Sequence, residues 1–202
     1  MIPDSVNTMS SQNTATGQRP GVGRRLLETL LELLPARAAK LSAQGLRCEP
    51  GVVIKTPSRL VLGRDVVLQR RALLHCGGKD WCDYGGGIEL GDGVVIGPGC
   101  TLYGAGTIQV GDFSHLGPGA MLIAQAGNVG SQNRLTTRPG HVNEPIVVGQ
   151  GVWIGAGAVV LGNTRLGDNC VVGPNSVVSG DYPDGTTLIG NPARAVQRRT
   201  AE

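Results

Sequence analysis

The sequence predicts an all-β solenoid, a coiled parallel sheet built from six-residue repeats. Five segments share one pattern, in which an aliphatic residue is followed by Gly, two polar or small residues, a small residue or Val, one spacer and another aliphatic residue: residues 60–68, 88–96, 108–116, 146–154 and 164–172. Late in the chain the aliphatic positions recur without interruption: Val148, Ile154, Val160, Leu166, Val172 and Val178. Gly accounts for 33 of 202 residues and aromatic residues for only 3%, which suits a thin core with many corners. A fixed internal period of this kind defines the fold class.

A period of six favours short strands. Six residues are three strand periods, so each aliphatic residue at this spacing points to the same side of the chain. Three strands make a turn of eighteen residues, and Val148 is therefore expected to stack on Leu166. Gly149 and Gly167 follow these positions, where the backbone bends and Gly can adopt positive φ. The core is then built by stacking one coil on the next.

The segment before the repeats divides into two parts. Residues 1–23 are rich in Ser, Thr, Asn, Gln, Gly and Pro, which predicts a disordered tail. Residues 24–45 predict an amphipathic helix whose apolar stretch is too short to span a bilayer. We favour a helix that caps the end of the solenoid, as such arrays require. The alternative is peripheral contact with a membrane surface through Arg24 and Arg25.

Two loops interrupt the coils. Equivalent aliphatic positions lie twenty-eight residues apart at Leu60 and Ile88, and thirty-eight apart at Ile108 and Ile146. The residues in excess of one eighteen-residue coil predict a shorter and a longer loop, roughly His75–Gly87 and Ala124–Glu144. Long loops in a compact domain are usually functional or disordered, so chemistry is expected there.

Charge and cysteine content limit the functional classes. The net charge is +3, with no long basic run and no interleaving of aromatic and basic residues, so nucleic acid is not an expected partner. Five Cys, an odd number, and the lack of a signal peptide favour a reducing cytoplasm. Cys100 and Cys170 fall on inward positions, where Cys acts as a small hydrophobe. Cys76 and Cys82 flank a loop beside His75, but their spacing matches no zinc pattern well.

Two stretches resemble a known family. Residues 145–161 contain Val-Trp-Ile-Gly-Ala-Gly-Ala and residues 177–194 end in Gly-Asn-Pro-Ala-Arg. Both are similar to segments of the hexapeptide-repeat acyltransferases, most closely the sugar and xenobiotic O-acetyltransferases. The resemblance covers residues 46–196 and leaves 197–202 as a C-terminal tail. It implies a left-handed parallel β-helix, whereas general rules alone would predict right-handed crossovers.

The resemblance also implies a cofactor and an assembly. Acetyl-CoA is the expected acyl donor, and the active site is expected between neighbouring subunits of a homotrimer. The residues that the resemblance assigns to cofactor binding are Trp153, Gly155, Ala156, Gly157, Gly173, Asn191, Pro192 and Arg194. Small residues let a thioester arm approach backbone N–H and C=O groups, and Arg can bind phosphate. The alternative is that the glycines only form corners.

Acyl transfer from a thioester to a hydroxyl needs a general base, and His suits this role because its pKa lies near neutrality. The family's His usually stands in the long loop, here in the window Gly127–Val129, which holds none. His141, in the same loop, is the first candidate for the catalytic base, against the alternative of a solvated loop residue. His115 is the second candidate and is expected to face outward, because it precedes the inward Leu116. A structural role is favoured for His75.

Three polar residues are candidates for substrate binding. Asn128 lies where the usual histidine is expected, and its amide can orient a hydroxyl or bind an oxyanion but cannot act as a base. Asp83 and Glu144 lie in the two loops and could orient a histidine or a sugar hydroxyl.

The leading hypothesis is an acyl-CoA-dependent O-acetyltransferase that acts on a hydroxyl of a sugar or polysaccharide precursor. An N-acetyltransferase acting on an aminosugar is a variant. A metal hydratase on this scaffold, like the γ-class carbonic anhydrases, would need three converging His ligands, whereas His75 and His115 fall on different faces of the coil. A degenerate member that binds CoA or acts as a scaffold is the third class, favoured by the missing loop histidine.

Overall fold

The structure is a computed structural model that describes residues 45–78, 85–127 and 141–198. Across these residues the predicted all-β fold is confirmed, and the helical structure that they contain is one short 3-10 turn, η1 (Pro57–Arg59). The predicted tail, residues 1–23, and the predicted helix up to residue 44 lie outside the described residues, so the cap and the membrane contact both stay predictions. No helix in the described part of the chain is long and apolar enough to cross a membrane.

Each coil contributes one strand to each of three parallel sheets. The strands of sheet A in the coils are β1 (Arg47–Cys48), β4 (Val67–Leu68), β7 (Val95–Ile96), β10 (His115–Leu116), β15 (Trp153–Ile154) and β18 (Val171–Val172). Sheet B consists of β2 (Val53–Lys55), β5 (Leu73–His75), β8 (Thr101–Tyr103), β11 (Met121–Ile123), β16 (Val159–Leu161) and β19 (Val177–Val178). Sheet C consists of β3 (Leu60–Leu62), β6 (Ile88–Leu90), β9 (Ile108–Val110), β14 (Ile146–Val148), β17 (Thr164–Leu166) and β20 (Asp181–Tyr182).

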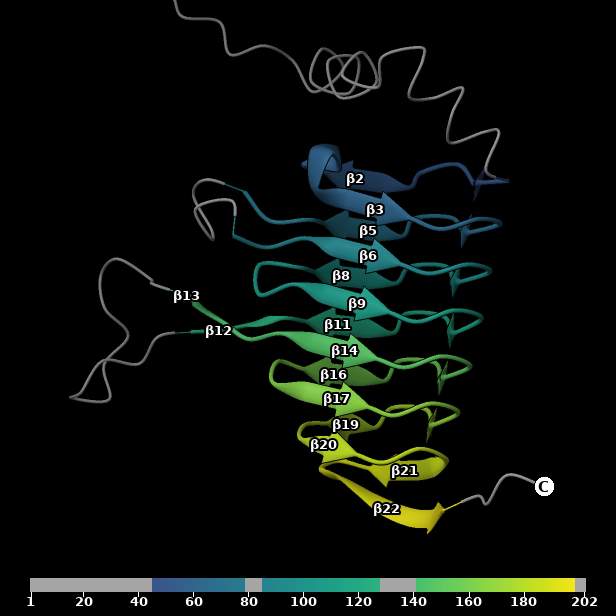
Figure 1. Ribbon diagram of the computed structural model, residues 1–202, viewed down its shortest axis with the longest axis vertical. Helices are drawn as coiled ribbons and strands as arrows, with labels where there is room; N and C mark the ends of the chain where they lie inside the picture. Colours follow the sequence, from purple (N-terminus) through teal and green to yellow (C-terminus); the bar gives the residue numbers. More distant parts are fainter. Residues whose placement is uncertain (1–44, 79–84, 128–140, 199–202) are drawn as a thin grey trace, which may run out of the picture. The chain divides into compact units, whose positions relative to one another are not determined.

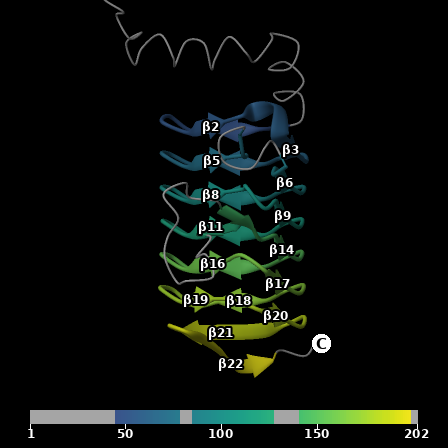
Figure 2. The ribbon, with the colours of Figure 1, turned by 90° about the vertical axis from the view of Figure 1, so that its left-hand side faces the viewer.

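The coil is left-handed, as the resemblance implies. In Figure 1 the chain runs from left to right along the front strands β6, β9 and β14, returns behind along β8, β11 and β16, and descends by one coil with each turn. Figure 2 shows the strands of sheet B stacked one above another along the same axis. The fold is therefore a parallel β-helix of triangular section.

Strand pairing confirms the predicted register. Ile108 pairs with Ile146 across the long loop, and Val148 pairs with Leu166 in the next coil. The short loop likewise leaves β3 in register with β6. Both loops leave the column between a strand of sheet B and a strand of sheet C, so they lie at the same corner. The surplus residues are thus displaced outward without disturbing the core.

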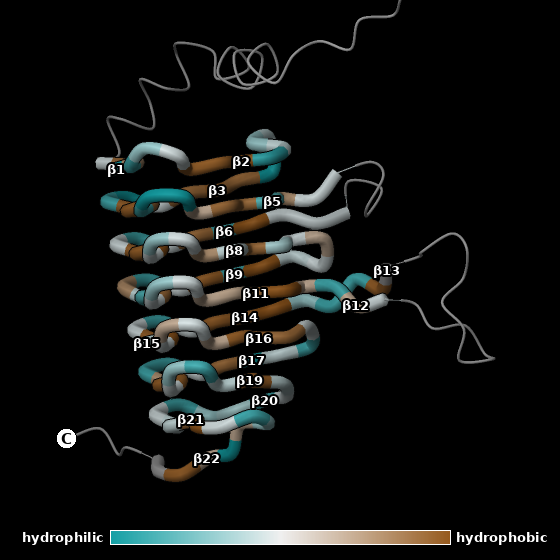
Figure 3. Tube along the Cα trace, turned by 180° about the vertical axis from the view of Figure 1, so that it is seen from behind, coloured by the Kyte–Doolittle hydropathy of each residue, from teal (hydrophilic) through white to brown (hydrophobic). Residues whose placement is uncertain are grey.

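The core is the inside of the coil. The aliphatic positions of the repeat are buried, among them Ile154, Val160 and Leu166. Cys100 is buried with them, and burial raises the pKa of its thiol to about 11. Figure 3 shows hydrophobic residues along the strands and hydrophilic residues at many of the corners. Such a narrow core consists mainly of stacked aliphatic side chains.

The same backbone geometry recurs in each coil at the corner between sheets C and A. Each turn there contains a residue with φ between 56° and 79°, a left-handed conformation that Gly, Asn and Asp tolerate best. The residues at this position are Gly45, Asp65, Gly93, Phe113, Gly151, Asn169 and Gly185. Phe113 is the exception in residue type.

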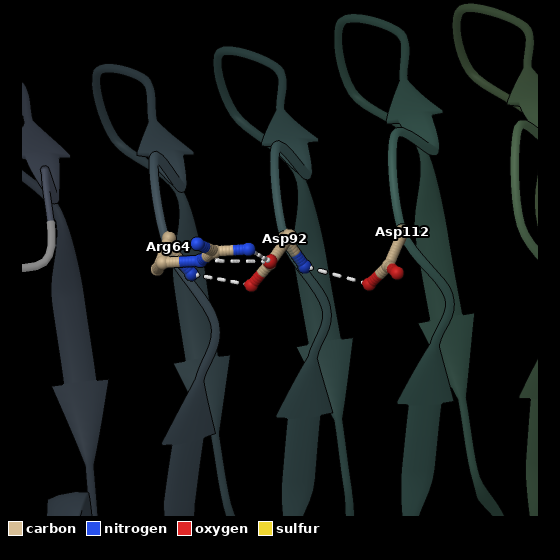
Figure 4. Close-up of polar contacts among 3 residues, drawn as sticks. All are labelled: Arg64, Asp92 and Asp112. Carbon is tan, nitrogen blue, oxygen red and sulfur yellow. Dashed lines mark hydrogen bonds and ion pairs between the residues drawn. The ribbon is translucent and has the colours of Figure 1, made fainter.

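Aspartates link successive turns of this corner along the axis. The backbone N–H of Arg64 donates to Asp92 Oδ1 (2.7 Å), and the N–H of Asp92 donates to Asp112 Oδ1 (2.8 Å), as Figure 4 shows. The Arg64 guanidinium also bonds Asp92 and lowers the pKa of that carboxyl. Preceding glycines leave room for these side chains: a Cβ on Gly91 would collide with Asp112. This explains the Gly-Asp pair of the repeat.

The C-terminal end departs from the hexad pattern. Strand β21 (Thr186–Gly190) still pairs parallel with β18, but β22 (Ala193–Arg198) turns back and pairs antiparallel with β21. The turn between them contains Gly190, at φ 107°, and a cis Asn191–Pro192 bond. The antiparallel pairing ends the parallel run of sheet A.

Candidate active site

The long loop begins and ends as a two-stranded hairpin. Strand β12 (Gln125–Gly127) pairs antiparallel with β13 (His141–Asn143), and both project from the corner between sheets B and C (Figures 1 and 3). Gly127 lies directly opposite His141. The sequence predicted only a loop here. Three-residue strands without apolar alternation carry too little signal for a strand prediction.

The hairpin places His141 beside the position that the resemblance reserves for a histidine. The window Gly127–Val129 begins at the residue that pairs with His141. Directly opposed residues of an antiparallel pair share one face of the hairpin, and their Cα atoms lie about 4.5–5.5 Å apart. Position 141 therefore lies next to the start of the window Gly127–Val129 in space. Asn128, the predicted substrate-binding residue in this window, lies outside the described residues.

Two amides occupy the same face of the hairpin. Gln125 pairs with Asn143, and both are two residues from the Gly127–His141 pair, so all four positions lie on one face. Asn143 is exposed and Gln125 half-buried. Sequence reasoning missed both, because their side-by-side placement depends on a hairpin that it did not predict.

Glu144 lies at the root of the hairpin, where the chain re-enters the column. Its N–H donates to the carbonyl of Ala124 (3.2 Å). Its carboxylate occupies space above Gly162 of the next coil, where an added Cβ would lie 2.5 Å from Glu144 Oε2. Glu144 therefore lies at the base of the hairpin with its carboxylate against the next coil, and its role toward a substrate or a histidine stays a prediction. Asp83, its counterpart in the short loop, lies outside the described residues.

His115 and Trp153 form a stacked pair on sheet A. They are register partners in adjacent coils, and their rings stack with centroids 4.5 Å apart and planes 19° apart. Trp153 is 51% exposed, and partial burial lowers the pKa of His115, because it disfavours the charged imidazole. The expected outward direction of His115 agrees with this exposed stack.

The two candidate bases do not meet within one chain. His115 and Trp153 are on sheet A, whereas His141 is on the hairpin that leaves the corner opposite that sheet. In Figure 3 the β12–β13 hairpin projects on one side of the column and β15 lies on the other. A single subunit therefore presents two separate candidate surfaces.

The predicted cofactor ledge lies at the corner between sheets A and B. Ala156 is exposed there, and the outer side of the same corner is open one coil earlier, because nothing lies within 4 Å of a Cβ built on Gly119. By contrast, a Cβ on Gly155 would meet Pro174 N at 2.6 Å, so coil stacking alone requires Gly there. The fold also favours Gly at positions 157 and 173. Gly157 has φ 67°, and a Cβ on Gly173 would lie 3.1 Å from Ile189 Cγ1. The open, small-residue corner fits a slender thioester arm.

The remaining predicted cofactor residues lie at the C-terminal turn. Asn191 and Pro192 are exposed between β21 and β22. Arg194 is also exposed, and its Nη1 donates to the carbonyl of Ala193 (3.0 Å). Phosphate binding by this exposed guanidinium stays a prediction.

The histidines do not converge. His75 lies on sheet B and His115 on sheet A, as the sequence predicted, and the described residues contain no cluster of three His, Cys, Asp or Glu side chains that could hold a metal ion. His75 is 9% exposed and stacks on Tyr103 with ring centroids 5.6 Å apart. Its place is beside the short loop, away from the sheet A pair.

Comparison with known proteins supports the same family. Residues 145–180 match the family model described as bacterial transferase hexapeptide (six repeats). A galactoside O-acetyltransferase of Lactococcus lactis is 30% identical over 131 residues, covering 65% of this chain and 59% of the relative. The galactoside O-acetyltransferase of Escherichia coli is 28% identical, covering 56% and 55%. The chain thus spans less than two thirds of the length of these curated relatives.

Solved structures share the fold. A hexapeptide-repeat acetyltransferase of Vibrio cholerae is 25% identical with a TM-score of 0.54, covering 87% of each chain, and it has also been crystallised with acetyl-CoA. An N-acyltransferase of Bacillus cereus, in complex with dTDP and 3-hydroxybutyryl-CoA, has a TM-score of 0.67 at 18% identity, covering 81% of this chain and 88% of that one. In its repeats, its β-helix and these relatives, the chain is similar to the hexapeptide-repeat acetyltransferases.

Proposed function

We propose that the protein is an acetyl-CoA-dependent O-acetyltransferase whose acceptor is a hydroxyl of a sugar or polysaccharide precursor. The support is twofold: curated relatives are named galactoside O-acetyltransferases, and a similar structure holds acetyl-CoA. The open corner at Gly119 and Ala156 suits the pantetheine arm. The reaction belongs in the cytoplasm, where acetyl-CoA is available, and the free buried thiols, such as Cys76, suit that compartment.

His141 is the proposed general base. The observation that carries this assignment is the pairing of His141 with Gly127, at the start of the window in which the family's histidine is expected. The imidazole accepts the proton of the acceptor hydroxyl while its oxygen attacks the thioester carbonyl. The carbon–sulfur bond then breaks, and the imidazolium returns the proton to the departing thiolate. Acetyl-CoA supplies the activated acyl group.

The complete site is proposed to form between copies in a homotrimer. The hairpin and the His115–Trp153 pair lie on different sides of one chain, so a site that uses both needs the hairpin of one copy near sheet A of another. The outer side of sheet B carries exposed apolar residues suited to association: Val53, Met121 and Leu161. His115 is the alternative base, and its lowered pKa would keep it neutral near pH 7.

The assignment is tested by thiol release from acetyl-CoA over a panel of free sugars, nucleotide-linked sugars and aminosugars. His141→Ala is expected to lower acceptor-dependent kcat by about 10²–10⁴-fold, the usual contribution of a general base. The matched control is His75→Ala, which removes a histidine that lies beside the other loop.

The panel also separates the alternatives. Loss of turnover in His115→Ala alone would transfer the role of base to His115. Turnover with aminosugars only would identify an N-acetyltransferase. Saturable CoA binding without turnover on any acceptor would show a degenerate member that has lost its base.

A further inference from the structure

Phe113 occupies a backbone position that disfavours it. It lies at the corner between sheets C and A with φ 57°, in the left-handed region. The equivalent residues of the other coils are of types that tolerate this conformation: Gly45, Asp65, Gly93, Gly151, Asn169 and Gly185. A bulky aromatic residue there is an outlier, and such outliers persist where another property of the side chain is needed.

Burial of the ring does not explain why Phe occupies position 113. The side chain of Phe113 is 69% exposed, the highest exposure among the exposed large apolar residues of the described chain. Phe113 contributes nothing to the core inside the coil, because it is not among the buried residues that form this core. The aromatic ring is therefore placed at the surface despite both its backbone strain and its hydrophobicity.

The ring is held in a defined place. A Cβ built on Gly93, in the preceding coil, would lie 2.7 Å from Phe113 Cδ1 and 3.0 Å from Cε1. The ring thus lies directly on the backbone of Gly93, which has no side chain to displace it. One side of the ring rests on the column and the rest is open to solvent. A ring fixed in this way loses little conformational entropy when a ligand stacks on it.

Phe113 adjoins the stacked pair of sheet A. His115 follows it by two residues in the same segment; Phe113 is exposed and His115 half-buried, whereas the intervening Ser114 is buried. Trp153 stacks on His115 from the next coil and is 51% exposed. We call Phe113, His115 and Trp153 the aromatic platform.

We propose that the aromatic platform binds a nucleobase, with Phe113 as its stacking residue. Exposed aromatic rings bind bases of any sequence through their π-faces. The inference rests on the proposed function, which supplies two sources of a base: the adenine of CoA and the base of a nucleotide-linked sugar acceptor. Phe113 leans toward the preceding coil and away from Trp153, so the base lies on the N-terminal side of the pair.

The test compares Phe113→Asn with wild type by calorimetric titration. Asn169 shows that the corner accepts Asn, at φ 56°, so the variant is expected to fold with an unchanged or higher thermal midpoint. The dissociation constant of the base-bearing probe is expected to rise by about tenfold, the loss typical of one base–aromatic stack. Phe113→Tyr, which keeps the ring, is expected to bind as wild type does.

Four probes identify the source of the base: CoA, phosphopantetheine, a nucleoside diphosphate sugar and the free sugar. Weaker binding of CoA but not of phosphopantetheine assigns the platform to adenine. Weaker binding of the nucleoside diphosphate sugar but not of the free sugar assigns it to the acceptor. Val61→Asn, at an exposed apolar position on sheet C, is the matched control. It is expected to leave the affinity for CoA and for the nucleoside diphosphate sugar unchanged.

Two results would overturn the proposal. One is equal affinity of wild type and Phe113→Asn for every base-bearing probe. The other is an equal loss for phosphopantetheine and free sugar, which would show general damage. Thiol release by the wild type tests the proposed function separately. If turnover is absent but Phe113→Asn still weakens nucleotide binding, the platform stands and the proposed function fails.

Discussion

Single residues on the outside of this fold are defined by their neighbours one coil above and below. His75 illustrates this, because its imidazole stacks on Tyr103, its register partner in the next coil. Burial, and secondarily the charge of Lys55, lower the pKa of His75, since both disfavour the imidazolium. The stack follows from the register of β5 on β8, which pairs the two residues.

This pKa shift predicts a pH-dependent stability. A histidine whose pKa is lower in the folded protein binds fewer protons when folded, so stability is lost as pH falls below the unfolded pKa of about 6.5. His75→Phe keeps a ring against Tyr103 and removes the titration. Between pH 7 and pH 5, the free energy of unfolding measured in urea should fall less in the variant than in wild type. Parallel curves would contradict the assignment.

Among the elements, the β12–β13 hairpin is separable from the column. The strands that flank it, β11 and β14, pair with their neighbours in adjacent coils on both sides. Without residues 125–143, Ala124 would be joined to Glu144, and three residues would connect Ile123 to Ile146. The previous coil turns the same corner with four residues, from Gly104 to Thr107.

Deletion of residues 125–143 should therefore leave the β-helix folded and abolish acceptor-dependent thiol release. The thermal midpoint, followed by circular dichroism, is expected to stay within about 5 °C of wild type, because surface loops contribute little to stability. Activity that survives the deletion would exclude both His141 and the hairpin amides from the chemistry. Unfolding of the variant would show that the hairpin is part of the core instead.

At the scale of the whole molecule, one chain presents its candidate surfaces in different directions. The hairpin leaves the corner between sheets B and C, and the aromatic platform lies on sheet A and its edge. The proposed trimer would bury the exposed apolar residues of sheet B, Met121 at 37% and Leu161 at 39%. Sheet C carries the exposed Val61 outward beside polar residues such as Glu89 and Gln109, which bond each other.

Leu161→Asp should therefore shift the protein from trimer to monomer. Light scattering coupled to size-exclusion chromatography would measure the mass, about three times 20.9 kDa for wild type if the trimer forms. Val61→Asp, on sheet C, is the control and should leave the mass unchanged. A trimer that survives Leu161→Asp would place the interface elsewhere, and a monomeric wild type would exclude the composite site.

Much of the fold could be predicted because hexad spacing is a local property. Each aliphatic position of the repeat points inward whatever the loops do, so the coil, the register of Val148 on Leu166 and the two loop positions all follow from counting residues. The outward direction of His115 follows in the same way. The composition of the corner, with its Gly-Asp pairs, reflects contacts between successive coils that the sequence alone does not reveal.

The sequence by itself determined the coil, its register and the positions of the two loops, because these depend on periodicity along the chain. The tertiary structure decided which residues share a surface. It paired His141 with Gly127, stacked His115 on Trp153 and laid Phe113 on Gly93. These contacts join residues from different coils or from the two arms of a loop, and their physical cause is stacking and hairpin pairing across the chain.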